Sequence, residues 1–221
     1  MPSDLPPTRW AAGGSANDGS GRVFARLVEA GEDVEGEARL ADALLPRGGR
    51  VLDAGSGMGR IAAALEARGH RVVAVEPDRA LVAQCRRTYP GLDVIEADLL
   101  EVTPELLAAR EGPDEFDLVV LVGNVMVFVA EETEREVLTR VAGLLAPGGR
   151  VLVGFHLTGG PSTAREYDPE EFVADVAAAG LRVDLRLGSY ELHPPEDAYA
   201  VWVLTLDGDA GPRGSHPKPV D

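Results

Sequence analysis

A glycine-rich turn between a buried strand and a helix constrains the fold of this chain more than any other feature. Residues 51–60 have the sequence VLDAGSGMGR, with glycines at positions 55, 57 and 59. Glycine adopts positive φ without a steric penalty and lets a ligand approach the bare backbone. The apolar residues 61–65 follow at helical spacing, so the first amide groups of that helix face the turn. This strand–turn–helix unit predicts a nucleotide-type site.

Acidic residues follow the next two predicted strands. Glu76 ends the strand expected near 71–76, about 20 residues past the glycine turn, where a carboxylate accepts hydrogen bonds from ribose hydroxyls. Asp98 follows the strand expected near 92–96, and the apolar Leu99 is its neighbour. An acid there can accept from an adenine amino group while Leu99 covers the ring. A glycine turn alone is a weak signal, and the two acids make it specific.

These segments resemble the class I S-adenosylmethionine-dependent methyltransferases. The resemblance covers residues from about 35 to about 206, in the family's order and spacing. The segments that carry it are VLDAGSGMGR (51–60), VVAVEPD (72–78), IEADLL (95–100), FDLVVLVGNV (116–125) and LLAPGGRVLVGF (144–155). It implies S-adenosylmethionine as the cofactor.

The resemblance also implies roles for individual residues in cofactor binding. The backbone of Gly55, Ser56 and Gly57 would hold the methionine moiety, and Glu76 would hold the ribose. Asp98 and Leu99 would hold adenine, and the segment with Gly123 and Asn124 would line the sulfonium side. Asp53 and Pro77 are also expected to belong to the cofactor site. The Gly123-Asn124 pair is similar to one in some small-amine N-methyltransferases.

Arg39 precedes the core in a region that often covers the cofactor's methionine end in this family. A guanidinium can form bidentate hydrogen bonds with the cofactor's carboxylate. Glu35 lies four residues earlier, so a surface ion pair along one helix is the alternative interpretation.

Apolar segments alternate with segments of helical periodicity, which is typical of a doubly wound α/β fold. The last two apolar segments, 181–190 and 198–206, are expected to form an antiparallel hairpin through Pro194 and Pro195. The family resemblance implies a seven-stranded, mostly parallel sheet of order 3-2-1-4-5-7-6, with strand 7 antiparallel and helices on both faces. The other strands are expected near 50–54, 71–76, 92–96, 116–122 and 149–156, and the helices near 58–69, 78–88, 103–110, 131–145 and 168–179.

The chain is expected to form one domain. Residues 21–206 form that domain, and within it residues 21–48 are expected to form a helical lid. Residues 1–20 are rich in Pro, Ser and Gly and are expected to be flexible. Residues 207–221 are polar and rich in Pro and Gly, which predicts a disordered tail.

Composition limits the partners. A net charge of −16 over 221 residues disfavours nucleic acid as a substrate, because phosphate backbones repel an acidic surface. There is no apolar run of eighteen residues and no basic–apolar leader, so no membrane association is expected and the cytoplasm is the expected location. The single cysteine, Cys85, excludes an internal disulfide and a cysteine-based metal cluster, and it is expected to be packed on a helix. No metal is expected, and the oligomeric state is left open.

Two residues are candidates for a catalytic role. His156 closes the strand expected near 149–156, so it faces the ligand edge of the sheet. Tyr167 lies on the long glycine-containing loop 158–168, which has the character of a substrate lid. A general base is needed only when the attacking atom arrives protonated.

The expected function is in-line transfer of a methyl group to nitrogen or oxygen of a small-molecule acceptor. Two alternatives stay open: a non-catalytic module that binds S-adenosylmethionine for regulation, and a protein methyltransferase. A dinucleotide-dependent dehydrogenase is disfavoured, because its G-x-G-x-x-G fingerprint would require glycine at the position of Arg60.

Overall fold

Seven strands form a single sheet in this computed structural model, which describes residues 5–17 and 19–209. The strand order is β3-β2-β1-β4-β5-β7-β6. Strands β1 to β5 pair in parallel, and β7 runs antiparallel to both β5 and β6. The predicted order and the reversed seventh strand are confirmed. The strands are β1 (Arg50–Ala54), β2 (Arg71–Glu76), β3 (Val94–Glu96), β4 (Phe116–Leu121), β5 (Leu145–His156), β6 (Leu181–Leu187) and β7 (Tyr199–Leu206).

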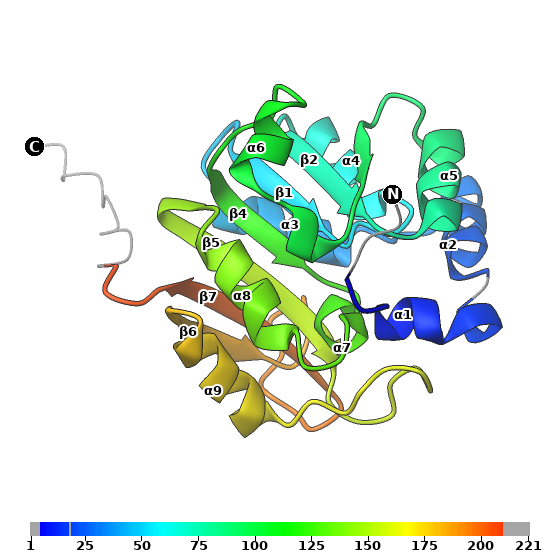
Figure 1. Ribbon diagram of the computed structural model, residues 1–221. Helices are drawn as coiled ribbons and strands as arrows, with labels where there is room; N and C mark the ends of the chain where they lie inside the picture. Colours follow the sequence, from blue (N-terminus) through cyan, green and yellow to red (C-terminus); the bar gives the residue numbers. More distant parts are fainter. Residues whose placement is uncertain (1–4, 18, 210–221) are drawn as a thin grey trace, which may run out of the picture.

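Helices cover both faces of this sheet (Figure 1). Helices α3 (Gly36–Leu44), α4 (Arg60–Ala67) and α5 (Arg79–Thr88) pack on one face. The opposite face carries α6 (Pro104–Ala108), α7 (Val125–Phe128), α8 (Glu134–Ala142) and α9 (Pro169–Ala178). Helices α1 (Arg9–Ala12) and α2 (Ser20–Glu29) precede the sheet, and short 3₁₀ turns occupy Gly14–Ala16 and Leu99–Glu101.

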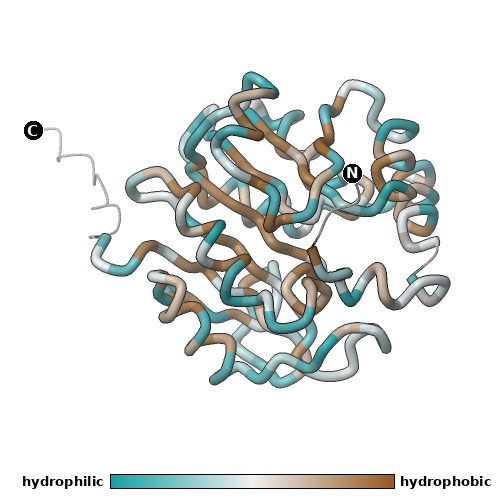
Figure 2. Tube along the Cα trace, viewed as in Figure 1, coloured by the Kyte–Doolittle hydropathy of each residue, from teal (hydrophilic) through white to brown (hydrophobic). Residues whose placement is uncertain are grey.

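Alternation along the strands divides the core between these two helical layers. Val51 packs with α3 and α4, whereas the next residue, Leu52, packs with the helices of the other face. Successive side chains of a strand point to opposite faces, so a strand covered on both sides is apolar at most positions. Figure 2 shows the result as hydrophobic segments along the central strands and hydrophilic turns at the periphery.

The structure differs from the sequence-based expectations at three places. Helix α7 was not expected; it begins after Asn124, which adopts φ 78°. Strand β5 begins at Leu145, because Leu145 pairs with Phe116 of β4 and the Pro-Gly-Gly segment forms an irregularity inside the strand. Residues 9–12, within the segment expected to be flexible, form α1, which contacts α7 through Trp10 and Phe128. The flexibility expected for residues 1–4 and the disorder expected for residues 210–221 lie outside the described residues.

None of the helices that the structure describes is both long enough and apolar enough to cross a bilayer.

Candidate functional site

A cavity of about 460 Å³ opens at the carboxyl ends of β1, β2, β4 and β5, a volume within the range of small-molecule sites. Doubly wound sheets bind ligands at this edge because the strand order reverses there. Eleven of the thirteen site residues predicted from sequence line this one cavity: Asp53, Gly55, Ser56, Gly57, Glu76, Pro77, Asp98, Leu99, Gly123, Asn124 and His156. Arg39 and Tyr167 do not line it.

The floor of the cavity is the turn between β1 and α4, and its glycines are required by the structure. Gly55 and Gly59 adopt φ of 81° and 82°. A Cβ atom at Gly55 would lie 2.7 Å from the Val125 side chain, and one at Gly59 would lie 2.6 Å from Sγ of the buried Cys85. Substitution at either position is therefore strained in φ and blocked by a neighbour. The turn leaves its backbone open to a ligand on the cavity side.

Asp53 joins the turn to the helix that follows it. Its Oδ2 accepts a hydrogen bond of 3.0 Å from the Ala62 backbone nitrogen, and its side chain is almost fully buried. Burial raises the pKa of Asp53 to about 7, although the hydrogen bond from Ala62 opposes this shift. Asp53 therefore holds the first turn of α4 against the end of β1.

Glu76 is preorganised to accept hydrogen bonds from a ligand. Its Oε2 accepts from the Gly57 nitrogen at 2.8 Å, and its Oε1 accepts from the Asp78 nitrogen at 2.9 Å. Burial raises the pKa of Glu76 to about 7. Each carboxylate oxygen has a second lone pair, so the group can still accept from a diol. This geometry fits the predicted ribose contact.

A buried hydroxyl in the same turn has no protein partner. Ser56 is 8% exposed, and its Oγ makes no hydrogen bond with any residue that the structure describes. A buried polar atom without a partner is unfavourable unless a ligand or water completes it. The residues present therefore fit a polar cofactor bound on the glycine turn.

Asp98 and Leu99 line the cavity just after the end of β3. Asp98 caps the 3₁₀ turn that follows it, since its Oδ1 accepts from the Leu100 nitrogen at 2.9 Å. Its burial raises the pKa of the carboxyl group. The Leu99 side chain is buried beside it and lines the cavity. An acid with an adjacent apolar side chain fits the predicted adenine contact.

His156 is held in one orientation by Asn124. Oδ1 of Asn124 lies 2.9 Å from the His156 backbone nitrogen and 3.0 Å from its Nδ1. Because the backbone N–H can only donate, the contacting atom of Asn124 is its oxygen, and Nδ1 must then carry the hydrogen that this oxygen accepts. The lone pair of the neutral ring is therefore on Nε2, and the ring lines the cavity. This tautomer makes Nε2 a proton acceptor.

Arg39 is not at the cofactor site, contrary to the sequence-based prediction. Its guanidinium is half exposed and pairs with Asp33 at 2.8 Å. The alternative pair with Glu35 is also wrong, because Glu35 bonds Arg68 at 2.7 Å. Glu35 is the N-cap of α3, and its carbonyl accepts the Arg39 backbone N–H at 3.0 Å, so the i, i+4 spacing is present but the two side chains bind other partners.

The cation that does line the cavity is Arg60, the first residue of α4. It forms a nearly buried bidentate ion pair with Glu37 of α3 and donates to the Val34 carbonyl at 2.6 Å. Its guanidinium also lies over the Phe24 ring, 4.8 Å from the centroid. Sequence reasoning used Arg60 only to exclude a dinucleotide fingerprint. Its place directly after the glycine turn was the signal available.

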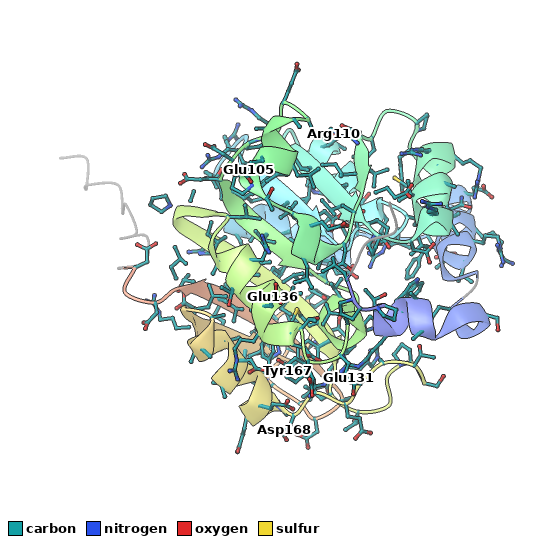
Figure 3. The ribbon with its side chains drawn as sticks, in the orientation of Figure 1. Glu105, Arg110, Glu131, Glu136, Tyr167 and Asp168 are labelled. Carbon is teal, nitrogen blue, oxygen red and sulfur yellow. The ribbon has the colours of Figure 1, made fainter. Side chains whose placement is uncertain are left out.

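Tyr167 is a core residue, and its predicted catalytic role is wrong in geometry. The side chain is fully buried, stacks on Phe155, and donates to Asp175 Oδ2 at 2.7 Å. Figure 3 shows it next to Asp168, where α9 is about to begin. Burial also raises the pKa of its phenol above the ordinary value. The loop turns this ring beneath α9 because an aromatic side chain with one satisfied hydroxyl is stable in a core.

Helix α1 lies against the rim of the cavity. Trp10 lines the cavity and donates to Asp78 Oδ2 at 2.6 Å, while its ring meets Phe128 edge to face with centroids 5.1 Å apart. Arg9 and Arg165 both bond Oε1 of the buried Glu134, at 2.8 and 2.6 Å. The N-terminal segment is thereby fixed to two separate parts of the site.

No cluster of three or more His, Cys, Asp or Glu side chains is arranged to hold a metal ion within residues 5–17 and 19–209.

Comparison with known proteins identifies relatives of this chain. Residues 51–149 match a family model described as a methyltransferase domain. A TehB-like SAM-dependent methyltransferase from Corynebacterium glutamicum ATCC 13032 Kitasato is 31% identical, with a TM-score of 0.72 over 84% of this chain and 95% of that one.

Two curated relatives match over shorter stretches. Carboxy-S-adenosyl-L-methionine synthase of Pseudomonas fluorescens SBW25 is 31% identical over 128 residues, which cover 55% of this chain and 48% of the synthase. Ribosomal RNA small subunit methyltransferase A of Koribacter versatilis is 38% identical over 86 residues, 37% of this chain and 30% of that protein. The matched part of this chain thus spans less than half of either relative.

Proposed function

Because this chain belongs to the class I S-adenosylmethionine-dependent methyltransferases, we propose that it methylates a nitrogen or oxygen atom of a small molecule, with His156 accepting the proton. The observation that carries this proposal is the Asn124–His156 hydrogen bond, which presents Nε2 to the cavity that also contains the cofactor residues. An alcohol or protonated amine must lose a proton when it is methylated, and a positioned base assists that loss.

Different residues of the chain would bind different parts of the cofactor, which supplies an electrophilic sulfonium methyl group. The backbone of Gly55 and Gly57 and the Ser56 hydroxyl would hold the methionine end, and the cation of Arg60 lines the same cavity. Glu76 would accept from the ribose hydroxyls, and Asp98 with Leu99 would hold adenine. Gly123, Asn124 and Pro77 would complete the walls.

Positioning is the protein's main contribution to such a reaction. Aligning nucleophile, methyl carbon and sulfur can supply roughly 7–11 kcal/mol of the barrier. The Asn124 bond, the cavity walls and the covering helix α1 fix the reacting groups and limit the entry of water. His156 would then receive the acceptor's proton as the new bond forms.

The negative net charge of the chain and the position of α1 at the cavity both favour a small acceptor over ribosomal RNA. The net charge of −16 opposes binding to a phosphate backbone. Trp10 of α1 lines the cavity and is held there by its bond to Asp78, so α1 limits the space available to an acceptor. A macromolecular acceptor would have to displace this contact.

Transfer of labelled methyl from S-adenosylmethionine into a size-fractionated extract of the source cell tests the proposal. We expect label in the small-molecule fraction. His156→Gln should keep cofactor affinity and lower the transfer rate roughly 10²- to 10⁴-fold, the usual effect of a lost acid–base group. His193→Gln is the matched control, because His193 is exposed and outside the cavity.

The other outcomes separate the alternatives. Label confined to protein or RNA would overturn the small-molecule assignment. Cofactor binding with no transfer to any fraction would support a regulatory module instead. An unchanged rate in His156→Gln would remove His156 from the mechanism.

A further inference from the structure

Two tyrosines form a hydrogen-bonded pair next to His156, and the cofactor motifs do not account for them. Tyr199, the first residue of β7, lies directly opposite His156 in the antiparallel pairing of β5 with β7. The two rings are perpendicular, with centroids 4.9 Å apart, and both residues line the cavity. Tyr190, from the connection between β6 and β7, places its hydroxyl oxygen 3.0 Å from that of Tyr199.

The backbone around these hydroxyls is shaped to admit them. A Cβ atom on Gly154 would lie 1.9 Å from the Tyr190 hydroxyl and 3.0 Å from that of Tyr199. Gly154 lies near the carboxyl end of β5, two residues before His156, so the pair of hydroxyls lies close to the residue that is proposed to accept the proton.

The direction of the hydrogen bond between the tyrosines follows from their surroundings. Two hydroxyl protons are present and only one lies between the oxygens. Tyr190 does not line the cavity, and the acceptor available to its proton within the described part of the chain is the oxygen of Tyr199. A buried O–H without an acceptor is unfavourable. Tyr190 therefore donates, and the proton of Tyr199 is directed to the cavity.

Both hydroxyls remain protonated at any ordinary pH. Burial raises the pKa of Tyr199 to about 12 and that of Tyr190 well above its usual value. The cavity therefore presents a fixed donor, the Tyr199 O–H, beside a fixed acceptor, Nε2 of His156.

We propose that Tyr199 determines acceptor specificity by donating a hydrogen bond to the methyl acceptor next to the group that His156 deprotonates. This inference rests on the proposed function and names its substrate class. The acceptor would be a compact molecule with an N–H or O–H adjacent to a carbonyl or imine-type nitrogen, such as a lactam or a hydroxy- or amino-substituted heteroaromatic ring.

The atoms of the transfer balance with S-adenosylmethionine as the methyl donor and His156 as the proton acceptor. The bond between the methyl carbon and sulfur would break, its electron pair would stay on sulfur, and a carbon–nitrogen or carbon–oxygen bond would form. The proton of the acceptor goes to His156 Nε2. Tyr199 keeps its own proton and holds the adjacent carbonyl or imine nitrogen throughout.

Two small probes test this arrangement on the full chain saturated with S-adenosylhomocysteine. 2-Pyridone has an N–H beside a carbonyl, whereas pyrrole has only the N–H. We expect protein-observed NMR titration to show tighter binding of 2-pyridone. Tyr199→Phe should weaken 2-pyridone binding by roughly 2- to 12-fold, the equivalent of one neutral hydrogen bond, and leave pyrrole unchanged.

Two further variants keep the result interpretable. Tyr190→Phe retains the Tyr199 proton and should therefore retain the preference for 2-pyridone. Tyr89→Phe removes a hydroxyl outside the cavity and should change neither probe. Melting temperature and S-adenosylhomocysteine affinity of each variant report whether the fold and the cofactor site are intact.

Several results would overturn the inference. These are equal or absent binding of the two probes, or a preference that survives Tyr199→Phe. A loss of S-adenosylhomocysteine affinity in Tyr199→Phe with unchanged 2-pyridone binding would assign the hydroxyl to the cofactor instead. A wild-type chain that does not bind S-adenosylhomocysteine would overturn the proposed function as well.

Discussion

Gly154→Ala is the substitution whose effect the structure defines most sharply. Gly154 lies within β5, opposite Val201 of β7. The new methyl group would lie 1.9 Å from the Tyr190 hydroxyl oxygen and 2.8 Å from the ring carbon that carries it. Carbon atoms do not approach other atoms this closely, so the Tyr190 ring must leave its position.

The size of the effect follows from two contributions. Overpacking by one methyl group costs about 1–3 kcal/mol, and the lost hydrogen bond between the tyrosines costs about 0.5–1.5 kcal/mol. We therefore expect the free energy of unfolding to fall by about 2–4 kcal/mol. For a chain of this size such a loss lowers the melting temperature by roughly 4–16 °C.

Thermal unfolding followed by circular dichroism measures this loss. Gly143→Ala is the matched control, since Gly143 has φ −69° and a Cβ there would meet its nearest neighbour, the Arg140 carbonyl, at 3.5 Å. That control should be neutral or slightly stabilising, because alanine lowers the entropy of the unfolded chain.

A double variant identifies the cause. In a Tyr190→Ala background the clash is absent, so adding Gly154→Ala should cost little further stability. The reasoning would be refuted if Gly154→Ala had the same melting temperature as the Gly143→Ala control. It would also be refuted if Gly154→Ala lowered the free energy of unfolding equally with and without the Tyr190 ring.

Three other predictions concern the cofactor site and its surroundings. Burial raises the pKa of Glu76 to about 7, and ribose hydroxyls bond its ionised form better, so S-adenosylmethionine affinity should rise up to tenfold per unit of pH below 7 and level off above it. Calorimetry from pH 5.5 to 8.5 measures this rise, and a flat wild-type profile, or an equal slope in Glu76→Gln, would contradict it. Tyr167→Phe should leave turnover within about twofold and lower the free energy of unfolding by about 1–3 kcal/mol, because Asp175 loses a buried hydrogen bond; a large fall in kcat at normal stability would restore a catalytic role. Trp10→Phe removes the bond to Asp78 and should speed cofactor release roughly 2- to 12-fold in stopped-flow experiments, whereas an unchanged rate would show that α1 does not retain the cofactor.

The fold was predictable because its signals are local and repeated. Each central strand has a short apolar run that precedes a turn, and most residues of β1, β2 and β4 are buried. The convergence of Asp53, Glu76 and Asp98 was predictable for the same reason, since each lies at or near the carboxyl end of a strand. Their meeting in one cavity is a consequence of parallel strand order.

The residues that were misplaced or missed from the sequence depend on contacts between segments that lie far apart in the chain. Arg60 meets Glu37 only because α3 packs on α4, and neither residue signals the other in the sequence. Tyr167 turns inward because Asp175, a full turn into α9, accepts its hydroxyl. Tyr199 reaches His156 only through the register of an antiparallel pair, and a shift of one residue would have sent its ring to the other face.

The single cysteine provides a built-in reporter of the cofactor turn. Cys85 is fully enclosed beneath Gly59, and burial raises the pKa of its thiol to about 11, so an alkylating reagent cannot modify it in the closed molecule. Modification therefore requires α5 to separate from the glycine turn that is proposed to bind the cofactor. The labelling rate of the unaltered chain, with and without S-adenosylhomocysteine, would measure how often that part of the molecule opens and how strongly the ligand suppresses the opening.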